Sequence, residues 1–234
     1  MGQKTNANEF RLGINEVDTP NVAVWFANNG RDYSSNLYTD IIVRDFILEK
    51  TKQAMVSEIN IERSSSDSLL VIIHCAKPGV ITGKGGAAIQ ALLAQLTNLV
   101  YKKTQKRVNI KISVKEVSRY EHHASLIAHS IATSIEKRVM PKKAMKREID
   151  RVMRAQGVSG IKIIVSGRIG GADIARSEKQ QAGRVPLHTL KANIKYHNTT
   201  AKTTYGIMGI KVWLFVEETH DSKKNKEMKD AAAS

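Results

Sequence analysis

A glycine-rich stretch contains the residues whose types and spacing could act on a phosphate. Residues 80–89 have the sequence Val-Ile-Thr-Gly-Lys-Gly-Gly-Ala-Ala-Ile, and they open a segment of helical period. Glycine lets the backbone adopt positive φ and lets a phosphodiester approach closely, while free helix N–H groups and the ammonium of Lys84 attract negative charge. The stretch therefore predicts a phosphate-binding loop at a helix N-terminus.

Two loops that bind small nucleotides share this physics, but their spacing fits poorly. A P-loop needs four residues between its first glycine and the Gly-Lys pair, whereas Gly79 and Gly83 are separated by three, and Gly85 stands where a hydroxyl residue belongs. A dinucleotide fingerprint could use Gly83, Gly85 and Ala88, but it lacks the acidic residue expected about 20 positions later. We therefore expect no cofactor and no small-molecule substrate.

The third interpretation is a Gly-x-x-Gly loop formed by Gly83, Lys84, Gly85 and Gly86. It resembles the loop of the K-homology (KH) RNA-binding domain, which clamps about four nucleotides of an RNA backbone. A glycine corner that only turns the chain remains an alternative at this point. The order of the helices and strands around the loop helps to decide between these two interpretations.

Hydrophobic periodicity predicts the elements that position this loop. They are a helix over residues 40–55, a hairpin with strands near 59–61 and 69–73, a helix over 87–103 and a strand over 108–114. Thr39 or Asp40 is a plausible N-cap of the first helix. The order helix, strand, strand, glycine loop, helix, strand is that of a type II KH domain, which implies residues 39–117 with helices on a mixed three-stranded sheet.

A second domain is expected over residues 118–216. Apolar residues at four-residue intervals indicate a helix over 122–139, and Pro141 begins another helix that continues to Gln156. Strands are expected at 161–166, 192–196 and 207–216, with a Gly- and Arg-rich connection after the first of them. The fold class is therefore α+β, with two helices on a mainly antiparallel sheet in this domain. Residues 217–234 have almost no apolar content and are expected to be a disordered tail.

The charge of the chain points to a polyanion as its partner. The 37 Lys and Arg residues exceed the 22 Asp and Glu residues, which gives a formal net charge of +15. Residues 1–101 have a net charge of −1, and residues 102–234 have a net charge of +16. Nucleic acid is the leading candidate, and a solvated basic surface is the alternative.

Other features exclude several classes of protein. The single cysteine, Cys75, forms no internal disulfide or multi-cysteine zinc site, which suits a reducing compartment. The longest aliphatic run, Leu69 to Ile73, is far shorter than the ~20 apolar residues of a membrane span, so no membrane association is expected. The histidines lack metal-binding spacing, and no metal site or catalytic triad is predicted.

The predicted helix after Pro141 has one apolar face and one basic face. Met145, Ile149, Val152 and Met153 fall on one side, and Lys143, Arg147, Arg151 and Arg154 on the other. Cations at a helix N-terminus oppose the helix dipole by roughly 0.3–1 kcal/mol each, so a lysine there indicates a functional position. Together with the Gly- and Arg-rich connection, this face predicts phosphate contacts from Arg147, Arg151, Arg154, Arg168, Arg176 and Arg184.

Segments along nearly the whole chain resemble the bacterial-type small-subunit ribosomal protein S-three family. They include Met-Gly-Gln-Lys at 1–4, Pro78–Gly86, Val165–Arg176 and Gly183–Leu190. The resemblance implies a structural, non-enzymatic constituent of the head of the small ribosomal subunit, in cytoplasmic ribosomes. The implied partners are small-subunit rRNA, mRNA and the ribosomal proteins S-ten and S-fourteen, and residues 1–38 would be an N-terminal extension contacting rRNA or neighbouring proteins.

The same resemblance assigns a role to the start of the basic helix. Lys142, Lys143 and Lys146 match family positions, commonly Arg, Arg and Lys, that line the channel through which mRNA enters and that assist its unwinding. Lysine keeps the charge but lacks the planar guanidinium fork, so we expect phosphate attraction with weaker directional hydrogen bonding. A free KH-type RNA-binding protein or RNA chaperone is the alternative function.

Overall fold

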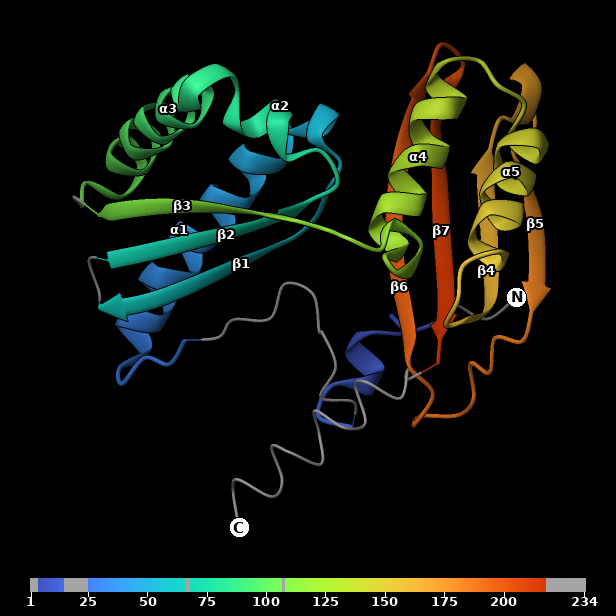
Figure 1. The fold of residues 1–234 in the computed structure, drawn as a ribbon, viewed down its shortest axis with the longest axis horizontal. Coiled ribbons are helices and arrows are strands. Elements are labelled where there is room, and N and C mark those ends of the chain that lie inside the picture. The colour runs from blue at the N-terminus through green and yellow to red at the C-terminus, as the bar shows by residue number, and fades with distance from the viewer. Residues whose placement is uncertain (1–3, 15–24, 66–67, 107, 218–234) are drawn as a thin grey trace. The chain divides into compact units, whose positions relative to one another are not determined.

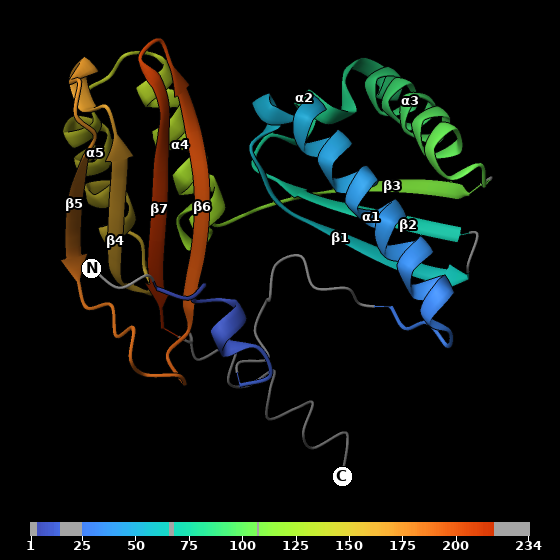
Figure 2. The same ribbon diagram turned by 180° about the vertical axis from the view of Figure 1, so that it is seen from behind.

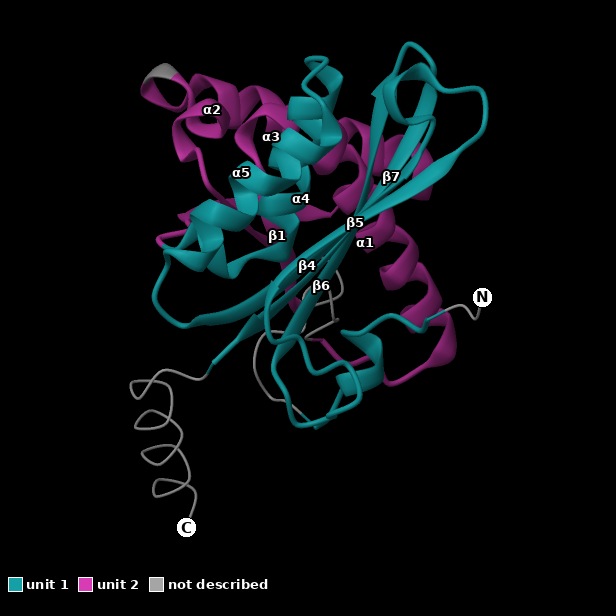
Figure 3. Cartoon of the chain, turned by 90° about the vertical axis from the view of Figure 1, so that its right-hand side faces the viewer, with its two compact units in different colours: residues 1–18, 119–234 teal, residues 19–118 magenta. Residues whose placement is uncertain are grey.

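The structure is a computed structural model that describes residues 4–14, 25–65, 68–106 and 108–217 (Figure 1). Contacts divide the chain into two compact units, one formed by residues 1–18 and 119–234 and the other by residues 19–118 (Figure 3). Residues 218–234 of the predicted tail lie outside the described residues.

The unit of residues 19–118 has two long helices on one face of a three-stranded sheet. Its elements are α1 (Gly30–Lys50), β1 (Val56–Ser65), β2 (Ser68–Cys75), α2 (Pro78–Thr82), α3 (Ala87–Thr104) and β3 (Asn109–Glu116). The strands lie in the order β1-β2-β3, with β1 antiparallel and β3 parallel to β2. This confirms the predicted order of elements and the mixed sheet.

The core of this unit forms because alternating strand residues and one stripe of each helix meet. Ile47 of α1 and Leu96 of α3 are fully buried against Ile61 and Val71 of the sheet. Each such side chain stabilises the unit by about 1.5–3 kcal/mol relative to its exposed state. This packing fixes where α3 begins and therefore where the glycine loop lies.

The predicted N-cap of the first helix is wrong. The helix α1 begins at Gly30, and Thr39 and Asp40 are buried inside it. The hydroxyl of Thr39 donates to the carbonyl of Ser35, and the carboxylate of Asp40 pairs with Arg63. The first ten residues of α1 carry little apolar periodicity, so the pattern that marks the helix appears only after it has already begun.

The other unit has a four-stranded antiparallel sheet with two helices on one face (Figures 1 and 2). Its elements are α4 (Ala124–Glu136), α5 (Pro141–Met153), β4 (Val158–Gly167), β5 (Arg176–Gly183), β6 (Ile194–Thr203) and β7 (Gly206–Val216). The strands lie in the order β5-β4-β7-β6. The two helices and the antiparallel sheet confirm the predicted α+β class.

One strand of this sheet was not predicted. The connection after β4 contains β5, which is an edge strand with no buried residue. An edge strand with polar side chains carries no hydrophobic alternation, so its sequence does not distinguish it from a loop. Its pairing is fixed instead by close approach to β4, where the Cβ of any side chain at Gly160 would lie 2.2 Å from the carbonyl oxygen of Arg184.

The N-terminal segment packs on the face of this sheet that the helices leave open. Ala7 joins Ala192, Ile194 and Trp213 in a small buried cluster. Trp213 is 5% exposed, which confirms its prediction as a core residue. On the opposite face, the rings of His129 on α4 and His197 on β6 lie 5.4 Å apart.

Candidate nucleic-acid interface

The glycine loop adopts a backbone conformation that requires glycine. Gly83, Gly85 and Gly86 have φ values of 67°, 62° and 80°, in the left-handed region that favours glycine. A Cβ at Gly83 would also lie 2.6 Å from the Cβ of Ala88, so the loop lies directly against the start of α3. The sequence therefore needs glycine here for geometry as well as for flexibility.

The outer part of the loop is open to a ligand. A Cβ at Gly85 or at Gly86 would meet no atom within 4 Å. Gly86 is the N-cap of α3, which has no side-chain cap and no acidic residue in its first turn. The first N–H groups of α3 and the positive end of its dipole are therefore available to an anion such as a phosphate. The side chain of Lys84, the predicted cation of the loop, lies outside the described part of the structure.

The basic helix α5 has the predicted two faces, with one exception. Met145, Ile149 and Val152 are buried in the core, whereas Met153 is exposed. The expectation that Met153 packs is wrong because it is the last residue of α5, where the helix leaves the sheet. The basic residues of the helix and its C-cap are all exposed, namely Lys142, Lys143, Lys146, Arg147, Arg151 and Arg154.

These cations differ in whether they form ion pairs with carboxylates of the protein itself. Lys142 is 71% exposed, and its Nζ lies 4.0 Å from Oε1 of Glu178 on β5. Lys143, Lys146 and Arg154 form no ion pair among the residues that the structure describes. An exposed pair at 4.0 Å is worth about 0–1 kcal/mol, so the start of α5 remains a cationic surface.

The two middle arginines of α5 are partly held in place. Arg147 donates to Oγ of Ser134 at 2.7 Å, and Arg151 lies 4.2 Å above the ring of Tyr120. Arg151 also lies 3.4 Å from the carboxylate of Glu121. Burial raises the pKa of Tyr120 to about 12, so this ring stays neutral beneath the guanidinium. Both arginines are oriented before any ligand arrives.

The remaining predicted arginines are not gathered at one place. The guanidinium of Arg168 donates to the carbonyls of Ala172 and Tyr205 and to Asp173, so it holds the turn after β4. Arg176 and Arg184 flank β5 at its two ends, roughly 26 Å apart at the usual strand rise. Both are exposed, whereas the six basic residues of α5 and its C-cap lie together on one helix.

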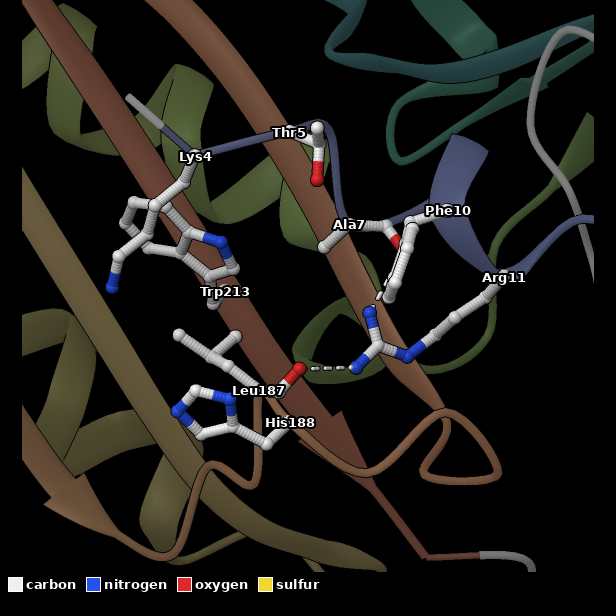
Figure 4. Close-up of a pocket in the computed structure, with 8 residues that line it drawn as sticks. All are labelled: Lys4, Thr5, Ala7, Phe10, Arg11, Leu187, His188 and Trp213. Atoms are coloured by element: carbon white, nitrogen blue, oxygen red, sulfur yellow. Dashed lines mark hydrogen bonds between the residues drawn. The ribbon is translucent and has the colours of Figure 1, made fainter. Parts of the chain in front are cut away.

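A cationic cavity on the open face of the sheet was not predicted from the sequence. It has a volume of about 360 Å³ and is lined by Lys4, Phe10, His188 and Trp213, among others (Figure 4). Lys162 on β4 lies beside it, with Nζ 5.1 Å from the centroid of the Trp213 ring. The burial of Lys162 could not be predicted from the sequence. It lies between Ile161 and Ile163, and a strand with alternating sides usually exposes such a residue.

Two absences hold for the described residues, 4–14, 25–65, 68–106 and 108–217. No group of three or more His, Cys, Asp or Glu side chains there could hold a metal ion. No helix there combines the length and the apolarity that a membrane crossing requires.

Comparison with known proteins identifies both units. Residues 42–121 match the family described as "KH domain", and residues 131–214 match "Ribosomal protein S3, C-terminal domain". The chain is 44% identical over 227 residues to the small ribosomal subunit protein uS3 of Coxiella burnetii strain RSA 331, with 97% of this chain and 95% of that protein covered. It is 45% identical over 221 residues to the proteins of the same name in Shewanella denitrificans and Shewanella baltica, with 94% of this chain and 91% of each relative covered.

Proposed function

The chain belongs to the small ribosomal subunit protein uS3 family, and from this premise we propose that the basic surface of α5 contacts mRNA where it enters the small subunit. Membership makes the protein a ribosomal, RNA-associated structural constituent of the small subunit and not an enzyme. The proposal concerns which of its surfaces meets which RNA. It names Lys142, Lys143 and Lys146 as the mRNA contacts.

The observation that carries this proposal is a set of cations placed against the preference of their own helix. Lys142 and Lys143 occupy the first turn of α5, where the positive end of the helix dipole disfavours them. Lys146 lies one turn further along the same surface, and all three are exposed. Such a placement lowers the stability of the free protein, and this loss is offset when a polyanion binds.

For the rRNA contacts, the arginines fall into two groups. The exposed side chains of Arg147, Arg151, Arg154, Arg176 and Arg184 can fork onto phosphates. Arg168 supports the turn after β4, and its contribution to RNA binding is mainly the shape of that turn. We also propose that the open loop from Gly83 to Gly86 clamps an RNA backbone, as in other KH domains.

The domain organisation and protein neighbours form a further part of the proposal. The expected boundary at residue 39 falls inside α1, which begins at Gly30, so residues 30–38 belong to the KH unit. Residues up to 117 of this unit act as the KH domain and residues 118–216 as the basic domain, and the part of residues 1–38 before α1 is an extension that contacts rRNA or neighbouring proteins. The packing of Ala7 and Asn8 on the sheet of the basic domain supports a role for the extension in shaping that surface. The family resemblance implies ribosomal proteins S-ten and S-fourteen as neighbours.

Ribosomes that carry Lys142→Ala/Lys143→Ala/Lys146→Ala test the mRNA contact. We expect normal amounts of assembled small subunits and slower translation of messengers with a hairpin downstream of the start codon, because the cations that hold the unwound strand are gone. The matched control is Lys142→Arg/Lys143→Arg/Lys146→Arg, which keeps the charge and adds the planar fork, and it should translate both kinds of messenger at least at the wild-type rate.

Equal rates on structured and unstructured messengers in the alanine variant would remove the mRNA role of α5. Sedimentation in moderate salt tests the ribosomal assignment itself. A structural constituent stays in the small-subunit fraction, whereas a free KH protein or chaperone leaves it.

A further inference from the structure

Three lysines converge on the face of the four-stranded sheet that lacks helices. Lys162 is only 6% exposed, and Lys4 of the N-terminal segment lies near enough for its charge to act on Lys162. Burial and the neighbouring charges of Lys4 and Lys179 lower the pKa of Lys162 to about 8. Among the residues that the structure describes, none of these three lysines forms an ion pair with a carboxylate.

This arrangement is unfavourable unless an anion joins it. Two ammonium groups at short distance repel each other, and the repulsion is stronger where burial removes water. The ring of Trp213, which lies beside Lys162, offers attraction but no full negative charge. An anion with oxygen acceptors between Lys4 and Lys162 would convert the repulsion into two charge-assisted hydrogen bonds.

A cavity beside these lysines has aromatic walls. Figure 4 shows side chains from the N-terminal segment, from β7 and from the connection after β5 around one hollow. Its volume of about 360 Å³ is near the lower end of the ~300–1,000 Å³ range of small-ligand pockets. Phe10 on its wall is 54% exposed, so its ring is available for stacking. The cavity has room for one nucleotide unit and not for a helix.

The walls of the cavity are fixed before any ligand binds. The guanidinium of Arg11 is buried and donates four hydrogen bonds of 3.0–3.1 Å, all to backbone carbonyl oxygens. The acceptors are Ala7 in its own segment and Leu187, Thr189 and Ala192 in the connection before β6. A site whose walls are already ordered loses less entropy when a ligand binds.

We infer that this cavity binds single-stranded RNA, with one base against Phe10 and an adjoining phosphate held between Lys4 and Lys162 beside the cavity. Phosphate with an aromatic-stacked base is the usual chemistry of single-stranded RNA recognition. An acidic peptide could satisfy the lysines, but it would leave the aromatic wall unused. The inference rests on the proposed RNA-binding function and adds a surface on the opposite face of the sheet from α5.

The test uses the full-length chain and a fluorescein-labelled oligouridine decamer in anisotropy titrations at several salt concentrations. Lys4→Met/Lys162→Met should bind about tenfold more weakly. The slope of log affinity against log salt should become shallower by about 0.7, because one phosphate fewer is neutralised by the protein. The control Lys202→Met removes one exposed lysine at the far end of β6 and should stay within about twofold of the wild type.

A second readout does not depend on the stability of the lysine variant. A decamer with 4-thiouridine should cross-link to peptides that contain Phe10, His188 or Trp213, and Phe10→Ala should lower that yield at least about fivefold. Circular dichroism establishes that each variant is folded. The exposed position of Phe10 makes this variant the safer one.

Several outcomes would overturn the inference. The double lysine variant could match the wild type in affinity and slope, or the cross-links could map only outside the cavity. The inference would also fail if an oligoglutamate peptide, and not the decamer, lost affinity in the double variant, since the cavity would then hold a protein segment. None of these results touches the α5 proposal, which is tested by translation rates. A wild-type chain that binds no RNA would instead contradict both.

Discussion

The side-chain amide of Asn8 and the backbone of Tyr196 exchange two hydrogen bonds, each 2.8 Å long. Nδ2 of Asn8 donates to the carbonyl oxygen of Tyr196, and Oδ1 accepts from its N–H. Tyr196 lies on β6, an edge strand, so the amide occupies the place of a residue in a further strand. The N-terminal segment is thereby joined to the sheet by polar pairing as well as by burial of Ala7.

Asn8→Ala should therefore destabilise the basic domain. The change leaves a partly buried N–H and a carbonyl on β6 without partners, which costs about 1–3 kcal/mol in the free energy of unfolding. Urea unfolding followed by far-UV circular dichroism measures the change. Asn198→Ala, an exposed position on the same strand, is the matched control and should lie within about 0.5 kcal/mol of the wild type. Equal losses in the two variants would show that the amide pairing adds nothing.

A second relationship joins α1 to β1 in the KH unit. The guanidinium of Arg63 forms a buried ion pair with Asp40, whose other carboxylate oxygen accepts a 2.7 Å hydrogen bond from Nε1 of Trp25. Arg63 also lies 5.4 Å from the centroid of the Trp25 ring. The side chains of the pair are each 4% exposed, so neither charge is solvated.

Arg63→Met should destabilise the KH unit by about 3–5 kcal/mol, because it removes the ion-pair partner of the buried carboxylate of Asp40 and leaves only the charge of Arg44 to act on it. The double variant Asp40→Leu/Arg63→Met removes both charges and should recover most of that loss. Thermal and urea unfolding of both variants provide the comparison. A double variant as unstable as the single one would show that packing around Trp25, and not charge compensation, dominates.

Asp40 also shows what the sequence could and could not reveal about the fold. Its residue type matches a helix N-cap, but its partner Arg63 lies 23 positions away and holds it inside α1. The order of elements was predictable because each core element has its own hydrophobic period. The strand β5 has no such period, since its place is fixed by backbone pairing with β4.

In the candidate site, too, only the part that follows from local periodicity could be predicted from the sequence. The basic face of α5 could be predicted because a helical period of about 100° per residue separates Lys143 from Met145 without any tertiary information. The role of Arg168 in its turn depends on Tyr205, a residue 37 positions away. The burial of Lys162 depends on Lys4 and Trp213, which only the folded sheet brings to it. Local patterns cannot encode contacts of that kind.

The histidine pair between α4 and β6 predicts a stability that depends on pH. Burial, and then the charge of His129, lower the pKa of His197 to about 4 from its ordinary 6.5, and burial lowers the pKa of His129 as well. The unfolded chain thus binds more protons than the folded one between about pH 6.5 and 4. The contribution of His197 to the free energy of unfolding is complete above about pH 6.5 and is lost as pH falls through this window, by up to about 1.4 kcal/mol per pH unit, and the lowered pKa of His129 acts in the same direction.

His197→Phe should flatten that dependence, since a phenyl ring fills the same space and binds no proton. Urea unfolding free energies at intervals between about pH 7 and pH 4.5 give the slope. His188→Gln, at an exposed position, is the control and should keep the wild-type slope. If the wild-type slope persists in His197→Phe, other groups are responsible for the acid sensitivity.

The open loop before α3 allows a test in which a single charge is the only variable. Gly85 has φ 62° and ψ 18°, which Asn and Asp tolerate better than other residues, and a Cβ there meets no atom within 4 Å. Gly85→Asp and Gly85→Asn should therefore cost about the same stability, roughly 1 kcal/mol. If the loop holds a phosphate, the aspartate should weaken binding of a single-stranded oligouridine about tenfold relative to the asparagine, because its carboxylate faces the same oxygens. Anisotropy titrations measure the ratio, and equal affinities for the two variants would mean that this loop only turns the chain.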